Sequence, residues 1–260
     1  MTKDSQVRAL LGALLAWGLA LIPWSAARAA EGPDALETVQ LEGKVGPYRV
    51  GMTLVVRDHT RIEGGHYFYA SKLTDIPLDG QAEDETVTLQ EPGGGAFRLH
   101  LVSNDSARGQ ALTFYNSTGL QGDWALGAKT LPVALAMTSG RFGPLPVHWY
   151  EDVTEDADTV YEARVRTFLH AVITGDRAAA ARGVSYPLQI NADAPGKRPL
   201  MIRSRAQLLS NWNRIFTPAL IARLKDAVPH EMFVHQGQVM VCDGTLWFDG
   251  MGAKVINSTE

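Results

Sequence analysis

The chain has 260 residues, of which 45% are hydrophobic and 20% are charged, and its formal net charge at pH 7 is −4. This composition is typical of a globular protein that is long enough to form two hydrophobic cores. Nucleic-acid binding needs clustered positive charge, and no basic run is present, so we expect no nucleic-acid partner. Because Cys242 is the only cysteine, an internal disulfide is excluded.

The N-terminus has the layout of a secretory signal peptide. Lys3 and Arg8 precede an uncharged run from Ala9 to about Trp24, and small residues follow up to Ala30. The run is shorter than the roughly 20 apolar residues that a membrane span needs. We therefore expect cleavage of residues 1–29, no stable membrane insertion afterwards, and a mature protein that is periplasmic or secreted.

Residues 36–140 read as an all-β domain. Alternation in Thr86–Leu89 and Phe97–Leu101 indicates strands with one buried and one wet face. Strands at this spacing, without helices between them, favour a meander rolled into a barrel or a sandwich. The expected strands are Pro47–Val56, Gly65–Ala70, Ile76–Leu78, Thr86–Leu89, Phe97–Val102, Ala111–Tyr115, Gly122–Leu126 and Leu131–Met137.

Turn residues separate these strands. Asp79–Gly80 and Ser117–Gly119 have turn composition, and Gly43 and Gly122 end segments of the form apolar-x-Gly. We expect such glycines to supply turns or bulges.

Residues 141–156 are interpreted as a linker. Gly143 and Pro144 interrupt the strand pattern, and acidic residues cluster from Glu151 onward without the spacing of an EF-hand calcium loop. We expect few contacts across this segment and two halves that unfold separately. Trp149 and Tyr150 are unusual in an exposed linker, so docking of these rings on one domain is the alternative.

From Ala157 the hydrophobic period becomes helical. The first helix is expected to end at Gly175, Asp176 should cap a second, and Thr217–Pro218 should start a later one. The expected order over residues 157–258 is two helices, two strands, two helices and three strands. The apolar stripe of the first helix consists of Val160, Tyr161, Val165, Phe168, Leu169 and Val172.

The strongest turn signal is Asp243–Gly244, which predicts a hairpin with a type I′ turn. The hairpin should place Val239, Val241, Leu246 and Phe248 on one face and Met240, Cys242, Thr245 and Trp247 on the other, both mostly buried. Cys242 would then lie within a strand.

This order of elements, together with Phe168–Asp176 and Tyr186–Leu188, resembles the nuclear-transport-factor-2-like (NTF2-like) superfamily, in which a bent sheet wraps a cone of helices. Segments such as Phe233–Met240 and Asp243–Phe248 look like an uncharacterised bacterial exported domain. The resemblance implies an α+β cone after the all-β domain. It implies a fold rather than a function, because the superfamily includes isomerases, dehydratases, transport factors and binding modules.

Catalytic and metal-binding motifs are missing from the sequence. We therefore assign no catalytic residue, no metal and no cofactor. The resemblance implies that an enzymatic cone would carry acid or base residues inside its pocket, and Tyr186 and His170 are the candidates for this alternative, a small-molecule isomerase or lyase.

Aromatic residues instead favour a ligand pocket in the second domain, with plain core packing as the alternative. The candidate ligand-binding residues are Tyr186, Trp212, Phe216, Phe233, Trp247 and His170. We expect a non-catalytic binding or accessory protein that engages a cell-envelope protein or a small apolar ligand. A homodimer through the C-terminal sheet is a further alternative, because the resemblance implies sheets that often pair face to face and the last strand, Ala253–Asn257, is expected at an edge.

Overall fold

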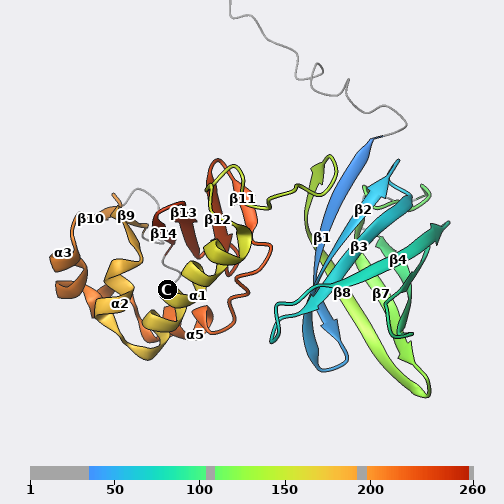
Figure 1. Ribbon diagram of the computed structural model, residues 1–260, viewed down its shortest axis with the longest axis horizontal. Helices are drawn as coiled ribbons and strands as arrows, with labels where there is room; N and C mark the ends of the chain where they lie inside the picture. Colours follow the sequence, from blue (N-terminus) through green and yellow to red (C-terminus); the bar gives the residue numbers. More distant parts are fainter. Residues whose placement is uncertain (1–34, 104–108, 192–197, 258–260) are drawn as a thin grey trace, which may run out of the picture. The chain divides into compact units, whose positions relative to one another are not determined.

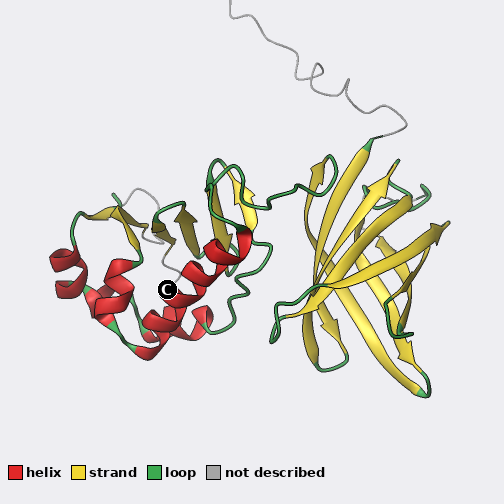
Figure 2. Cartoon of the chain, in the orientation of Figure 1, coloured by secondary structure: helices red, strands yellow, loops and turns green. Residues whose placement is uncertain are grey.

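The computed structural model describes residues 35–103, 109–191 and 198–257. The predicted signal peptide lies outside these residues. Contacts group Ala35–Glu260 into one compact unit. Within it, buried hydrophobic side chains form two clusters, one between Val39 and Leu135 and one between Trp149 and Ile256. Within these described residues, helices occur only in the C-terminal part (Figure 2).

The first part is a closed antiparallel barrel in which β1 pairs with β8 (Figure 1). Of the two expected architectures, the structure has the barrel. Its interior positions alternate as predicted, with Val87, Leu89, Phe97 and Leu99 at most 1% exposed. The strands are β1 (Leu36–Val45), β2 (Tyr48–Arg57), β3 (Arg61–Tyr69), β4 (Ile76–Glu83), β5 (Thr86–Gln90), β6 (Ala96–Ser103), β7 (Ser117–Leu126) and β8 (Lys129–Phe142).

Glycines inside the strands allow the barrel to curve. Gly43 and Gly122 lie within β1 and β7, not in turns. A Cβ at Gly43 would collide with the backbone oxygen of Ala134, and one at Gly122 with that of Arg98. The expected glycine pattern therefore marks close approach of neighbouring strands rather than hairpin turns.

Several expected boundaries in the barrel are wrong. Asp79–Gly80 and Ser117–Gly119 lie inside β4 and β7. Ala111–Tyr115, expected as a strand, instead runs into a turn over residues 114–116, where the Thr113 amide donates to Oδ1 of Asn116 at 2.7 Å. A local side-chain hydrogen bond of this kind competes with strand pairing.

The C-terminal part has a mixed sheet in the order β10-β9-β14-β13-β12-β11, in which β14 runs parallel to β9. Its strands are β9 (Val184–Asn191), β10 (Leu200–Ile202), β11 (Phe233–His235), β12 (Gln238–Val241), β13 (Leu246–Asp249) and β14 (Gly252–Asn257). Its helices are α1 (Asp158–Thr174), α2 (Arg177–Arg182), α3 (Arg205–Ser210), α4 (Trp212–Ile215) and α5 (Pro218–Leu224). Because β14 is central, the expectation that it forms an edge is wrong.

The predicted helix caps are confirmed. Gly175 has φ 77° at the end of α1, the Asp176 side chain accepts from the Ala179 amide, and the Thr217 side chain accepts from that of Leu220. Val160 was wrongly placed in the buried stripe of α1, since it is 51% exposed. None of the helices in the described ranges is both long and apolar enough to cross a membrane.

The predicted hairpin forms, with a different turn. Val241 pairs with Leu246, so the loop holds four residues, and Cys242 lies in this turn rather than in a strand. The two-residue turn with positive φ at both positions is Gln236–Gly237, where φ is 49° and 73°. This additional turn divides the expected first strand of the hairpin into β11 and β12.

Part of the expected linker belongs to the C-terminal core. Trp149 is 9% exposed and Tyr150 is 0% exposed. The indole nitrogen of Trp149 donates to the carbonyl of Met232 at 2.9 Å. The structure therefore shows that these two rings dock on the C-terminal core, which was the alternative to an exposed linker.

Candidate functional site

A hollow of about 720 Å³ lies between the outer wall of the barrel and the outer face of the C-terminal sheet. We call it the junction hollow. In the described part of the chain, three other hollows are smaller, with volumes of about 270, 350 and 330 Å³. The walls of the junction hollow comprise Gln40, Glu42, Arg49, Thr138, Ser139, Arg223, Asp226, Val228, His230, Glu231, Met232, Phe233, Met240, Val241, Cys242, Asp243, Gly244 and Trp247.

The sheet supplies an apolar wall. Met240 pairs with Trp247 across β12 and β13, so their side chains share the face opposite to the buried Val239 and Phe248. Met240 also pairs with Phe233 on β11, the strand on the other edge of β12, so Phe233 lies on the same face. Of this face, Phe233, Met240 and Trp247 are only half-buried. The face that the sequence predicted to be covered is therefore partly open.

The barrel supplies charged groups. Arg49 donates to the backbone carbonyl of Asp226 at 3.0 Å and lies 3.7 Å from its carboxylate. Partial shielding from water and the carboxylate of Asp243 raise the pKa of Glu42, while Arg49 opposes this effect. One wall of the hollow thus offers aromatic and thioether surface, and the other offers groups of both charges.

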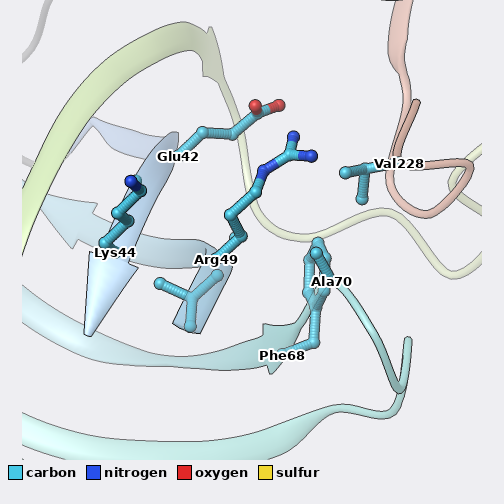
Figure 3. Close-up of a pocket in the computed structure, with 9 residues that line it drawn as sticks. Glu42, Lys44, Arg49, Phe68, Ala70 and Val228 are labelled. Carbon is cyan, nitrogen blue, oxygen red and sulfur yellow. The ribbon is translucent and has the colours of Figure 1, made fainter. Parts of the chain in front are cut away.

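A smaller hollow of about 270 Å³ shares Glu42, Arg49 and Val228 with the junction hollow. Figure 3 shows the side chains of Glu42 and Arg49 extending from the barrel strands, with Val228 contributed by the loop after α5. Lys44 and Phe68 also line it from the barrel side. The two hollows therefore adjoin each other at Glu42 and Arg49.

Beside the junction hollow, Glu231 contacts the barrel. Its carboxylate lies 2.7 Å from Nε2 of His66 on β3 and accepts a hydrogen bond from Thr53 on β2, also at 2.7 Å. The Gln40 side chain on β1 donates to the Glu231 carbonyl at 2.8 Å. Glu231 adopts φ 45°, an unusual conformation for a residue with a side chain.

The neighbouring His230 bridges two carboxylates. Its Nε2 lies 2.9 Å from Asp75 in the β3–β4 loop, and its Nδ1 lies 3.0 Å from Glu162 on α1. The ring also packs edge-on against Phe68, with centroids 4.5 Å apart. Burial alone would lower the pKa of His230, but hydrogen bonds to Asp75 and Glu162 outweigh it and raise the pKa to about 10.

Tyr150 connects this cluster to the C-terminal core. Its hydroxyl donates to Glu162 at 3.0 Å and accepts from the Met232 amide at 3.1 Å. Burial and the Glu162 carboxylate raise the pKa of the Tyr150 hydroxyl. The tyrosine therefore acts as a neutral hydrogen-bonding group beside a buried carboxylate.

The six ligand-binding candidates from the sequence lie in different places. Phe233 and Trp247 line the junction hollow. Trp212 and Phe216 are buried in the C-terminal core, with ring centroids 4.4 Å apart. Tyr186 is half-buried and donates to the Ala181 carbonyl at 3.2 Å.

His170, the sixth candidate, is exposed on α1. Neither His170 nor Tyr186 lines the junction hollow or any of the three smaller hollows. Tyr186 and His170, the acid/base candidates for an enzymatic cone, therefore do not meet in any of these hollows.

The residues that join the barrel to the C-terminal part are not among the candidates predicted from the sequence. One signal was available: Val50–Val56 is almost continuously apolar, which indicates a strand covered on both faces. In the structure the outward-facing Thr53 is only 1% exposed, and its hydroxyl donates to Glu231. No local pattern marked His230 and Glu231 themselves.

Among the described residues, no three His, Cys, Asp or Glu side chains are arranged to hold a metal ion. Comparison of the chain with protein-family models, with curated proteins and with solved structures gave no match.

Proposed function

We propose that this protein is an exported, non-catalytic binding protein whose ligand occupies the junction hollow. The observation that carries the proposal is the half-buried wall of Phe233, Met240 and Trp247 facing a volume of about 720 Å³. Small-ligand sites are usually concave, of this size, and lined by apolar side chains with a few polar groups.

The walls favour a small amphipathic ligand. An apolar body would pack on Trp247, Met240 and Phe233, where it would displace water from apolar surface. A polar end would face Glu42 and Arg49 on the barrel side. A ligand of this kind uses both walls, which neither part of the chain supplies alone.

Export and family membership are part of the proposal. The charged and apolar layout of residues 1–29 supports export. The helices α1 and α2 before a β9–β10 hairpin, and the parallel pairing of β14 with β9, support an NTF2-like assignment for residues 157–258. That superfamily includes pure binding modules, so the assignment is compatible with binding without catalysis.

The proposal is tested by titrating the full mature chain with the neutral apolar probe phenylnaphthylamine and recording heat or fluorescence. We expect saturable binding that Trp247→Ala weakens at least about tenfold, because an aromatic anchor at the centre of a site carries much of the affinity. Met251→Ala is the control, since Met251 is 78% exposed and does not line the hollow. Binding that Trp247→Ala and Met251→Ala leave equally strong would contradict the proposal, as would no binding at all.

A further inference from the structure

We propose that His66 and His230 form a pH-sensitive joint between the barrel and the C-terminal part, which loosens when the two rings lose their protons. The joint consists of His66, Asp75, Glu162, His230 and Glu231. It goes beyond the proposed function, and only its effect on ligand binding rests on that function.

In the first half of the joint, side chains from three barrel strands contact a single residue, Glu231. Glu231 receives contacts from β1, β2 and β3 through Gln40, Thr53 and His66. The side chains of His66 and Glu231 are 13% and 10% exposed. In such a shielded position a histidine and a carboxylate attract each other strongly only when the ring is charged.

The second half depends on both nitrogens of one ring. Each ring nitrogen of His230 faces a carboxylate oxygen, at 2.9 Å for Asp75 and 3.0 Å for Glu162. A protonated imidazole donates from both nitrogens, whereas a neutral one donates from one and presents a lone pair at the other. A neutral His230 would therefore place a lone pair against a carboxylate. The geometry fits the charged ring.

The charges around the joint balance only when both rings are protonated. Three carboxylates face it: Asp75 from the β3–β4 loop, Glu162 from α1 and Glu231 from the loop before β11. Opposing them are the two histidines and Arg166 on α1, which lies 3.9 Å from Glu162. Deprotonation of the rings leaves Arg166 as the positive charge against three carboxylates, because the hydroxyls of Tyr150 and Thr53, which donate to Glu162 and Glu231, are neutral. Repulsion between the carboxylates then favours separation.

The direction of the pH effect follows from the histidines. Burial would lower the pKa of His66, but the hydrogen bond and charge of Glu231 outweigh it and raise the pKa. For His230 the corresponding rise is from 6.5 to about 10. The joined state binds these protons more tightly than the separated state. The joint is therefore strongest below pH 6.5 and weakens as pH rises through about 10.

Acid conditions weaken the joint through Asp75 rather than through the histidines. The hydrogen bond from His230 lowers the pKa of Asp75 from its ordinary value of 3.8. The contribution of Asp75 is therefore present above that value and is lost as pH falls below it. Because His230 and Glu231 line the junction hollow, opening of the joint would also move its walls.

The test is small-angle scattering of the mature chain from pH 6.5 to above about pH 10, with far-ultraviolet circular dichroism on the same samples. We expect the radius of gyration to increase with pH while the dichroism stays constant. In His66→Gln/His230→Gln the radius should be large at both ends of the range. His100→Gln, which changes an exposed histidine on the outside of the barrel, should behave like the original chain.

A constant radius in the original chain, or expansion that coincides with loss of secondary structure, would overturn the proposal. If the double variant does not fold, Asp75→Asn provides the second test, because Asp75 is 47% exposed and its replacement is mild. Removing this carboxylate should shift the expansion to lower pH, and an unchanged midpoint would count against the joint. Probe binding is recorded in parallel, so that expansion without any probe binding would remove the proposed function and leave the joint intact.

Discussion

Nε2 of His66 lies 2.7 Å from the carboxylate of Glu231, although 165 positions separate the two residues in the chain. The pair connects the barrel to the loop before β11, while the hydrophobic residues of the two parts form separate clusters. Charged and polar contacts therefore join the two parts, together with the ring contact between Phe68 and His230. Such contacts respond to pH and to single substitutions more sharply than an apolar interface does.

Replacing Glu231 should destabilise the chain. Glu231→Ala leaves His66 and Thr53 without their shielded partner, and we expect the free energy of unfolding to fall by about 3 kcal/mol. Urea denaturation at neutral pH measures it. Glu83→Ala, at an exposed position on β4, is the control and should change stability by less than about 0.5 kcal/mol. Equal effects of the two substitutions would show that the Glu231 contacts contribute little.

Tyr150→Phe should also be costly. The substitution removes the hydroxyl that donates to Glu162 and accepts from the Met232 amide, so the buried amide loses this acceptor and the carboxylate keeps only its other partners, such as His230. We expect a loss of about 1–3 kcal/mol in thermal or urea unfolding. Tyr115→Phe serves for comparison, since Tyr115 is 59% exposed. A Tyr150→Phe variant as stable as Tyr115→Phe would contradict the role given to this hydroxyl.

The cap of α2 can be tested by a pair of substitutions at one position. Asp176→Ala removes the acceptor that lies 2.9 Å from the Ala179 amide and should cost about 1 kcal/mol. Asp176→Asn keeps a side-chain oxygen in place and should remain close to the original stability. If both substitutions cost the same, the charge of Asp176 rather than its hydrogen bond would matter.

Cys242 should react slowly with thiol reagents. Burial, opposed by Arg223 and assisted by Asp243, raises the pKa of the Cys242 thiol to about 11. The thiolate is the reactive form, so alkylation at pH 8 should be about a hundredfold slower than for an ordinary thiol. Mass spectrometry of iodoacetamide-treated protein measures the rate, with the urea-unfolded chain as reference. Equal rates in folded and unfolded protein would contradict this environment.

Local signals in the sequence predicted much of the fold. Alternating residues such as those of Thr86–Leu89 indicated half-buried strands, and Asp176 and Thr217 marked helix starts, because these features depend on neighbours a few positions away. Turn placement was less predictable. Asp243–Gly244 had the composition of a two-residue turn, yet pairing of Val241 with Leu246 produced a longer loop.

The candidate site was harder to predict, because it is assembled from distant segments. Phe233 and Trp247 were recognised as aromatic candidates, but their position on the outer face of the sheet depends on the strand register. His230 and Glu231 follow Pro229 in a loop without periodicity, so nothing local distinguishes them. Only the almost continuously apolar run Val50–Val56 indicated that another surface covers β2.

The most direct test of the central claim, that the junction hollow binds a ligand, is a titration of isotope-labelled mature protein with phenylnaphthylamine followed by amide chemical shifts. We expect the largest changes in β12 and β13 around Met240 and Trp247, together with changes at residues 40–49 on the barrel. Changes confined to the helical core around Tyr186 and Trp212, or no saturable change anywhere, would contradict the account.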